Sequence, residues 1–264
     1  MKKVLFVLAL ATMVFVSCGK DKEDSNLAQQ MLGKWMLTQV NGRTVPTNEK
    51  VVITFVSDTQ GYISAARVIN NENHLKWANH MSGDVMVEGD RISMFGNFNK
   101  TTSFTAIIDV KSISDTEIMA ELKYTVYLNG ESLYETGGTV LCTKVETDFS
   151  NEILGTWEGR VTSAEGSEFD DGELHRWEYL ADGTYVYYQQ DENGQWVSNT
   201  NEMSEYFVDG ILLCTRWRNT NEEEDSHEWW EIASIENGVM NWTALRQRED
   251  GTSYTATFSM TRVQ

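Results

Sequence analysis

A short phrase near the start of the chain is repeated about halfway along it. Residues 32–35 read LGKW, and residues 154–157 read LGTW, 122 positions later. Three further pairs follow in the same order at nearly the same spacing: residues 112–113 with 234–235, 129–132 with 250–253, and 143–145 with 261–263. Self-similarity at one long period is the signature of a duplicated unit. The sequence therefore predicts two tandem domains of one fold, domain one at residues 27–147 and domain two at residues 150–264.

The hydrophobic pattern inside each repeat is that of β-strands. In residues 254–261 apolar and polar side chains alternate, as they do along a strand with one buried face. Asn-Gly and Asp-Gly pairs, which favour tight hairpin turns, separate such runs at short intervals. Consecutive short strands joined by hairpins form an antiparallel up-and-down sheet, and closing that sheet removes its exposed edges. We therefore predict an all-β protein made of two small antiparallel up-and-down β-barrels.

The first residues predict export and lipid attachment. Residues 1–17 combine two lysines with an apolar run too short to span a bilayer, as in a signal peptide. The run ends at Ser17-Cys18, which resembles the lipobox of bacterial lipoproteins, although Phe15 stands where leucine is usual. The resemblance implies acyl chains such as palmitate on Cys18, with residues 18–26 as an acidic, solvated tether. The residues after Cys18 resemble an outer-membrane sorting signal and a surface-export signal. A signal peptide with an incidental cysteine is the alternative.

The repeated phrase also resembles a family signature. Gly33 and Trp35, and Gly155 and Trp157, open the first predicted strand of each repeat, as Gly-x-Trp does in lipocalins. In that family the tryptophan closes one end of the barrel, and a basic residue from the last strand covers its ring. The resemblance implies these roles for Trp35 with Lys144 and for Trp157 with Arg262. The family's C-terminal helix has no counterpart here. The chain is therefore similar to the lipocalin-like domains of bacterial lipoproteins.

Charge and metal-ligand spacing exclude several classes of partner. The net charge is −19, and residues 150–264 alone carry 23 acidic residues, 7 arginines and no lysine. So acidic a domain repels phosphate backbones, which argues against nucleic acid as a partner. Neither the four histidines nor the acidic runs at residues 170–173 and 222–225 have the spacing of a zinc or EF-hand site. We expect no metal and no cofactor.

The sequence also bears on catalysis and on the cysteines. It holds no nucleophile motif, so we expect no enzyme, although a pair of carboxylates for glycoside hydrolysis stays open. Lipidation of Cys18 leaves Cys142 and Cys214, one in each repeat. Because both align with large apolar residues of the other repeat, we expect buried thiols. The alternative is an interdomain disulfide, which an exported protein could form.

Aromatic residues indicate where a ligand would bind. Seven of the nine tryptophans lie in domain two. We therefore expect domain one to act as a spacer and domain two to bind a small apolar or amphipathic molecule without catalysis. The alternatives are a carbohydrate- or protein-binding module that uses outward rings and a hydrolase of the cell envelope. The predicted ligand contacts are Trp177, Tyr187, Trp217, Trp230 and Trp242.

Overall fold

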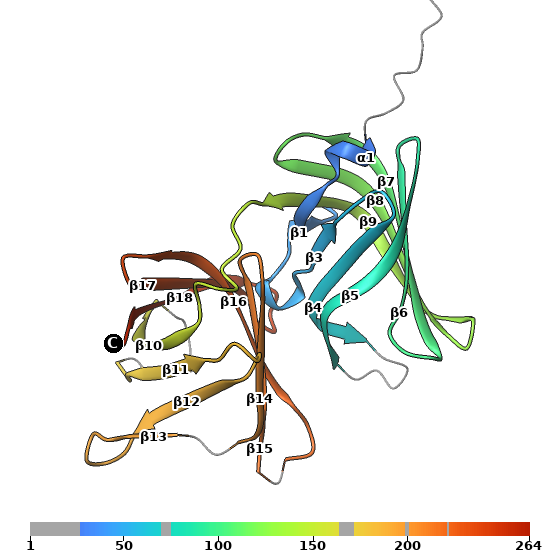
Figure 1. Cartoon of the computed structure of the whole chain (residues 1–264). Helices are drawn as coiled ribbons and strands as arrows, with labels where there is room; N and C mark the ends of the chain where they lie inside the picture. The colour runs from blue at the N-terminus through green and yellow to red at the C-terminus, as the bar shows by residue number, and fades with distance from the viewer. Residues whose placement is uncertain (1–26, 70–74, 164–171, 199–200, 221) are drawn as a thin grey trace, which may run out of the picture.

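The computed structural model describes residues 27–69, 75–163, 172–198, 201–220 and 222–264 (Figure 1). The predicted signal peptide, Cys18 and the tether at residues 18–26 lie outside this range, as does His74. Nearly all of the described chain is in antiparallel β-strands, and these form two tandem sheets. The all-β fold expected from the alternation and the hairpin signals is present. None of the described helices is long and apolar enough to span a membrane.

Domain one is a closed barrel of eight antiparallel strands. Its strands follow one another around the barrel in chain order, and the first pairs with the last, so these eight strands close on themselves. Short elements flank the first strand: α1 (Leu27–Gln30) before it, and β2 (Arg43–Thr44) and the 3-10 helix η1 (Thr47–Glu49) after it. The barrel strands are β1 (Gly33–Val40), β3 (Val52–Phe55), β4 (Gln60–Ile69), β5 (Leu75–Glu88), β6 (Arg91–Asn97), β7 (Thr102–Ile113), β8 (Glu117–Leu128) and β9 (Glu131–Val145).

Domain two repeats this arrangement but does not close. Its sheet runs β13-β12-β11-β10-β18-β17-β16-β15-β14, so the first and last repeat strands, β10 and β18, again pair. Between the two ends of the sheet, a single bridge joins Thr184 to Glu205. The result is a half-barrel, splayed at one end (Figure 1). Its strands are β10 (Gly155–Ser163), β11 (His175–Tyr179), β12 (Tyr185–Gln190), β13 (Trp196–Ser198), β14 (Asn201–Asp209), β15 (Leu212–Asn219), β16 (Ser226–Glu236), β17 (Val239–Gln247) and β18 (Ser253–Arg262).

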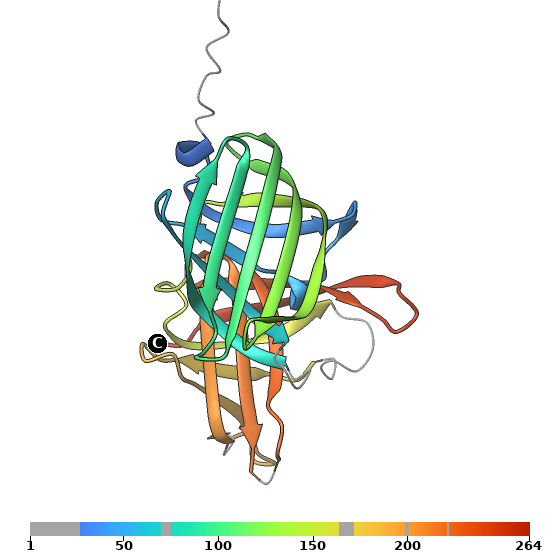
Figure 2. The same ribbon diagram turned by 90° about the vertical axis from the view of Figure 1, so that its right-hand side faces the viewer.

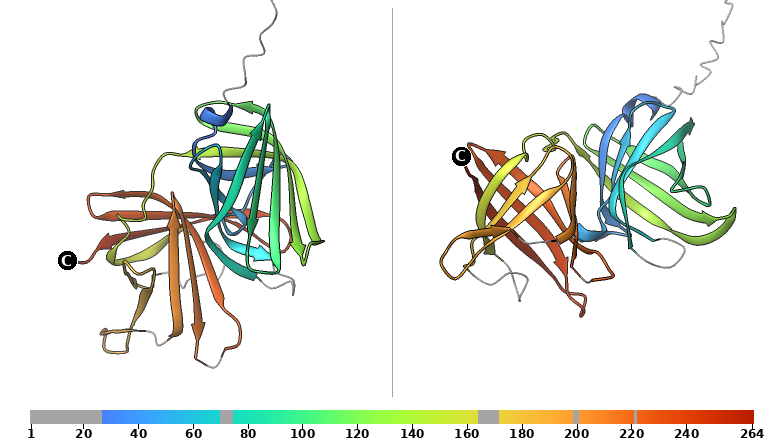
Figure 3. Two further views of the ribbon diagram at one scale, coloured as in Figure 1. Left: turned by 45° about the vertical axis from the view of Figure 1, so that its right-hand side comes forward. Right: turned by 60° about the horizontal axis from the view of Figure 1, so that its bottom comes forward.

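The two domains lie side by side and share an apolar cluster (Figure 3). Met36 and Val52 of domain one pack with Phe207, Leu212 and Cys214 of domain two, and all five are buried. A shared buried cluster of this kind resembles a small core rather than a polar domain contact. The sequence repeat did not indicate it, because these residues occupy outward positions of their own sheets.

Two ion pairs join the domains beside the shared cluster. Lys34 pairs with Asp209, whose side chain is only 1% exposed, and contacts Asp148 at 2.9 Å. Lys50 pairs with Glu231 at 2.8 Å. Leaving one member of a buried pair without the other is costly. These pairs therefore fix how the domains are joined.

Both remaining cysteines are buried thiols, as the repeat indicated, and they lie in different clusters. Cys142 belongs to the core of domain one, whereas Cys214 belongs to the cluster between the domains. The interdomain disulfide considered from the sequence is therefore not formed.

Candidate functional site

The barrel of domain one encloses a cavity of about 950 Å3. This volume lies at the upper end of the range of about 300–1,000 Å3 that is usual for small-molecule sites. All eight barrel strands contribute to its lining, so the cavity runs along the barrel interior. Inward-pointing side chains such as Ile92, Ile108 and Ala120 alternate along their strands with residues that face outward.

The cavity wall is apolar and uncharged in its interior. Cys142 lines it inside the barrel, and Tyr124 and Tyr134 line it nearer the open end, where Tyr124 pairs with Thr136. Burial raises the pKa of the Cys142 thiol to about 12, and burial together with the neighbouring Tyr134 raises the pKa of Tyr124 well above its usual value. Both groups are therefore neutral at physiological pH. The interior offers dispersion contacts and exclusion of water, and no buried charge that a ligand would need to match.

Strand register explains why domain one is hollow. Trp35 pairs with Ile53, and its counterpart Trp157 pairs with Trp177, so Ile53 and Trp177 occupy equivalent positions. In the last two strands, the pair Ala120–Val140 of domain one corresponds in the same way to the pair Trp242–Phe258 of domain two. The equivalence is fixed by Lys144 and Arg262, which pair with Trp35 and Trp157. Domain one thus carries smaller side chains at three positions where domain two carries large rings.

These rings fill the interior of domain two. Trp177 packs against Trp242 and Phe258 with ring centroids 5.4 and 5.3 Å apart, at tilted or edge-on angles typical of aromatic cores. Tyr179 adds an edge contact to Tyr206 at 4.8 Å. The abundance of aromatic residues, which suggested a ligand site from the sequence, is accounted for by this packed core.

The five predicted ligand contacts all belong to this core or its margin. Trp177, Trp230 and Trp242 are buried members of the cluster, and Tyr187 and Trp217 are half-buried and pack against it. None of the five lines the cavity of domain one. Their role as ligand contacts stays a prediction, whereas the structure gives them a packing role. The residues that sequence reasoning missed are Ile53, Ala120 and Val140, whose small size relative to the second repeat was the available signal.

The outward rings of domain two have packing partners as well. In the pair Trp229–Trp230 the two side chains point to opposite faces, as strand neighbours must. Trp229 packs on the cluster between the domains and stacks on His227 at 5.9 Å. Trp196 lies under the guanidinium of Arg176, 4.1 Å from the ring centroid. These two outward rings therefore pack against side chains of this domain, and the carbohydrate-binding alternative stays a prediction.

The closed end of each domain has the contacts that the lipocalin resemblance implies. Trp35 and Trp157 are fully buried, and each indole donates a hydrogen bond of 2.6 Å to the carbonyl four residues earlier. The Lys144 ammonium lies 5.2 Å from the Trp35 ring centroid, and the Arg262 guanidinium lies 4.1 Å from that of Trp157.

The repeated glycine lies beside this covering cation. Gly155 has φ +111°, a backbone conformation that favours glycine, and an added Cβ would lie 2.7 Å from an Arg262 guanidinium nitrogen. Gly33 has φ +114° in the same position. The Gly-x-Trp phrase therefore reflects a structural requirement at the closed end rather than ligand binding.

Polar residues border the cavity at the opposite end, which we call the mouth. They include Asn41, Arg43, Glu49, Thr136 and Gln247. The first four belong to domain one, but Gln247 ends strand β17 of domain two. Arg43 is exposed and forms no ion pair with the described part of the chain. An apolar interior with a polar rim suits an amphipathic molecule whose tail enters and whose head stays at the surface.

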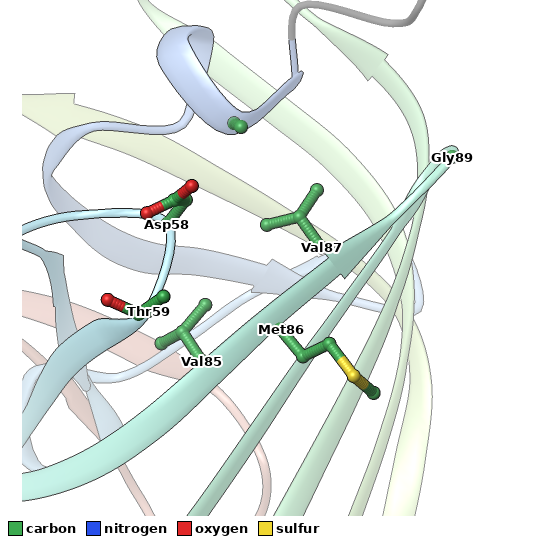
Figure 4. Close-up of a pocket in the computed structure, with 7 residues that line it drawn as sticks. Asp58, Thr59, Val85, Met86, Val87 and Gly89 are labelled. Carbon is green, nitrogen blue, oxygen red and sulfur yellow. The ribbon is translucent and has the colours of Figure 1, made fainter.

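A second, smaller hollow lies beside helix α1 at the closed end of the barrel (Figure 4). It has a volume of about 380 Å3 between helix α1 and the turn before β4. Val85 and Val87 point toward Asp58 and Thr59 across it, while Met86 points to the other side of the strand (Figure 4). It is lined by few side chains and brings together no chemically distinctive group.

The titratable groups of the described residues do not assemble a metal site. No cluster of three or more metal-ligating side chains occurs among them. His175 is buried, and its Nδ1 lies 2.7 Å from the Tyr187 hydroxyl in the aromatic core. Burial lowers the pKa of His175, so its ring is neutral at physiological pH. His175 therefore serves as a hydrogen-bonded core residue.

Comparisons with known proteins give similarity at the level of solved structures only. No protein-family model matches the chain, and no curated protein matches it. Two solved structures that resemble this chain are mutants of the vaccine antigen transferrin-binding protein B from Haemophilus parasuis Hp5. Their sequence identities to this chain are 7% and 8%, and their TM-scores are 0.23 and 0.22. In both comparisons the match covers 85% of this chain and 62% of the antigen.

Proposed function

We propose that this protein binds a small apolar or amphipathic molecule, without catalysis, inside the barrel of domain one. The observation that carries the proposal is the cavity of about 950 Å3 with an apolar, uncharged interior. Burial of an alkyl chain there would contribute about 0.8 kcal/mol for each methylene group removed from water. The sequence placed the site in domain two; the cavity supports domain one instead.

The ligand class follows from the mouth as well as from the interior. The polar rim suits the head group of a single-chain amphiphile, whose tail would enter the apolar interior. Arg43 offers a positive charge and Glu49 a negative one, and Asn41, Thr136 and Gln247 offer hydrogen bonds. Fatty acids and related single-chain lipids have this combination of an apolar tail and a compact polar head.

The residues around the cavity also support a non-catalytic role. Its charged lining residues, Arg43 and Glu49, both lie at the mouth, and no histidine lines it. General acid–base or nucleophilic catalysis needs such groups in contact with the reacting atoms. Burial raises the pKa of Cys142 and Tyr124, so both stay neutral, and a wall of this kind can hold and shield a molecule.

Binding can be tested by displacement of a fluorescent probe. The purified protein is titrated with 1-anilinonaphthalene-8-sulfonate, and palmitic acid, hexadecanol and a mixture of oligosaccharides are then added separately. We expect the two long-chain molecules to displace the dye and the oligosaccharides to leave it bound. Displacement by oligosaccharides alone would support the carbohydrate-binding alternative and contradict the proposal.

We further propose that the protein is a lipoprotein held at the outer membrane through Cys18. The support is the signal-like segment at residues 1–17 and the lipobox-like residues that follow it. Several acyl chains on one cysteine give stable membrane attachment. Metabolic labelling with a palmitate analogue should mark the wild-type protein and leave the Cys18→Ser variant unlabelled. Labelling of that variant would contradict attachment at this residue.

A further inference from the structure

One segment of domain one both borders the cavity and forms the contact with domain two. This mouth segment, residues 43–51, contains β2 and η1 and contributes Arg43, Val45, Glu49 and Val51 to the cavity lining. It leaves strand β1, turns back, and lies between the two domains (Figure 3). The face of the segment away from the cavity contacts strands β16 and β17 of domain two.

Thr47 is the centre of that contact. Its side chain is 1% exposed, and its hydroxyl donates a 2.9 Å hydrogen bond to Glu231 of domain two. The same hydroxyl oxygen accepts a 2.8 Å hydrogen bond from the backbone N–H of Leu245, also in domain two. One side chain of the mouth segment is thus bonded to two strands of the other domain.

Lys50 strengthens the same contact by charge. Its ammonium lies 2.8 Å from the second Glu231 oxygen, and the side chains of Lys50 and Glu231 are only 9% and 14% exposed. Glu231 therefore uses one oxygen for Thr47 and the other for Lys50, which fixes both ends of η1. A charge-assisted pair shielded from water in this way is stronger and more geometrically specific than an exposed one.

Domain two also reaches the cavity directly. Gln247, two residues beyond Leu245 on strand β17, is part of the cavity lining at the mouth. Figure 2 shows the β17–β18 hairpin extending beside the mouth end of the barrel. Leu245, which bonds to Thr47, and Gln247, which lines the mouth, therefore lie close together on the same strand of domain two.

We propose that domain two is part of the ligand site: it holds the mouth segment through Glu231 and supplies Gln247 to the rim. The proposal rests on the proposed binding of an amphiphile in domain one. Glu231 is a positioning residue, because it acts through Thr47 and Lys50, whereas Gln247 contacts the ligand head. Binding in the barrel and docking of the domains are then thermodynamically coupled, and each must strengthen the other by the same factor.

The first arm of the test measures affinity. Palmitic acid is titrated into the wild type, Glu231→Gln, Glu231→Lys and Gln247→Ala. Glu231→Gln removes the charge and keeps the shape, while Glu231→Lys places two ammonium groups together and drives the mouth segment away. We expect affinity to fall about 5- to 150-fold in Glu231→Lys, the usual range of coupling between sites, and less in the other two variants.

The matched control is Glu135→Gln. Glu135 pairs with Lys123 on the outside of the same barrel, with both side chains more than half exposed, so the variant makes the same charge change away from the contact. Far-UV circular dichroism of every variant shows whether the sheets are intact. A variant that loses its sheets is replaced in the comparison by Thr47→Val, which removes the two hydrogen bonds at their other end.

The second arm follows the reciprocal effect in the wild type. The exchange rate of the Leu245 amide with solvent deuterium is measured with and without palmitic acid. Because this amide is bonded to Thr47 across the domains, the coupling predicts slower exchange in the complex. The Arg262 amide, which bonds within domain two at 2.8 Å, serves as the internal reference.

The outcomes separate this inference from the proposed function. If the wild type does not bind palmitic acid or hexadecanol, the proposed function fails and this inference fails with it. If the wild type binds and the folded Glu231→Lys variant binds equally well, with unchanged exchange at Leu245, the role of domain two is refuted while the cavity site stands. Weaker binding together with ligand-dependent protection of Leu245 supports the inference.

Discussion

Filling the barrel of domain one with the residues of domain two tests the origin of the cavity. In the variant Ala120→Trp with Val140→Phe, two adjacent inward positions receive the side chains that domain two carries at Trp242 and Phe258. The change transplants a pair of residues that already pack together, with ring centroids 5.6 Å apart. We expect ligand binding to be lost while the fold is kept.

Whether these substitutions raise or lower the free energy of unfolding depends on whether the barrel interior is hollow. An aromatic ring buries about 150–250 Å2, which at about 25 cal/mol per Å2 sets an upper bound of about 4–6 kcal/mol for each ring. Adding the same rings to a filled core would instead cost about 1–3 kcal/mol through overpacking. Since the cavity of about 950 Å3 has room for both rings, we expect the free energy of unfolding to stay the same or to rise.

Denaturant unfolding and dye displacement by palmitic acid measure the two effects on the same samples. The control is Met119→Trp, which adds a ring beside Ala120 but on the outer face, where Met119 is 45% exposed. This control should bind palmitic acid as the wild type does. A stable filled variant that still binds palmitic acid would show that the ligand site lies elsewhere. A loss of several kcal/mol on filling would show that the barrel interior is already packed.

Three further predictions concern the closed ends, the domain contact and the buried thiol. In urea unfolding, Arg262→Met should lower the free energy of unfolding by about 1–2 kcal/mol, and Lys144→Met should lower it by less than about 1 kcal/mol. The reason is that Arg262, in addition to covering its tryptophan as Lys144 does, donates hydrogen bonds to two backbone carbonyls. Burial alone would lower the pKa of Lys34 and raise the pKa of Asp148. The hydrogen bonds that Lys34 makes with Asp209 and Asp148 outweigh burial, so the pKa of Lys34 is raised and the pKa of Asp148 is lowered. Asp148 therefore adds to the free energy of unfolding above its unfolded pKa of about 4, and this addition is lost as the pH falls through its lower folded pKa. The addition from Lys34 persists until the pH rises through its raised pKa. The stability difference between wild type and Lys34→Met should accordingly shrink below about pH 4; a difference that grows in acid would contradict this. Labelling of Cys142 by a thiol reagent at pH 8, located by mass spectrometry, should be more than about 1,000-fold slower than for an ordinary thiol, because its pKa is about 12; labelling at an ordinary rate in the folded protein would refute its burial.

The duplicated all-β architecture could be predicted because its signals are local. Alternation along strands, Gly-containing turns and the repeated Gly-x-Trp phrase are each read within a few residues, and the covering of Trp35 by Lys144 and of Trp157 by Arg262 follows the family resemblance. These contacts depend on backbone geometry shared by both repeats. They survive the divergence of the side chains that fill the barrels.

The location of the cavity depends on differences between the repeats, which the abundance of tryptophan alone did not reveal. Trp177 and Trp242 add side-chain volume to the interior of domain two, where both belong to the buried core. A comparison of side-chain size at equivalent positions, such as Ala120 with Trp242, would have indicated the hollow domain. The domain contact could not be read from either repeat, because Thr47 and Glu231 become neighbours only when the two sheets are placed together.

The most direct test of a ligand site in domain one is a crystal structure with a bromine-labelled fatty acid. The protein is crystallised with 12-bromododecanoic acid, and the anomalous signal of bromine locates the end of the alkyl chain. We predict one strong peak inside the barrel of domain one, between Ile53 and Ala120 and toward the closed end at Trp35, with the carboxylate at the mouth. A peak among the aromatic residues of domain two, or on the outer surface of either sheet, would contradict the account.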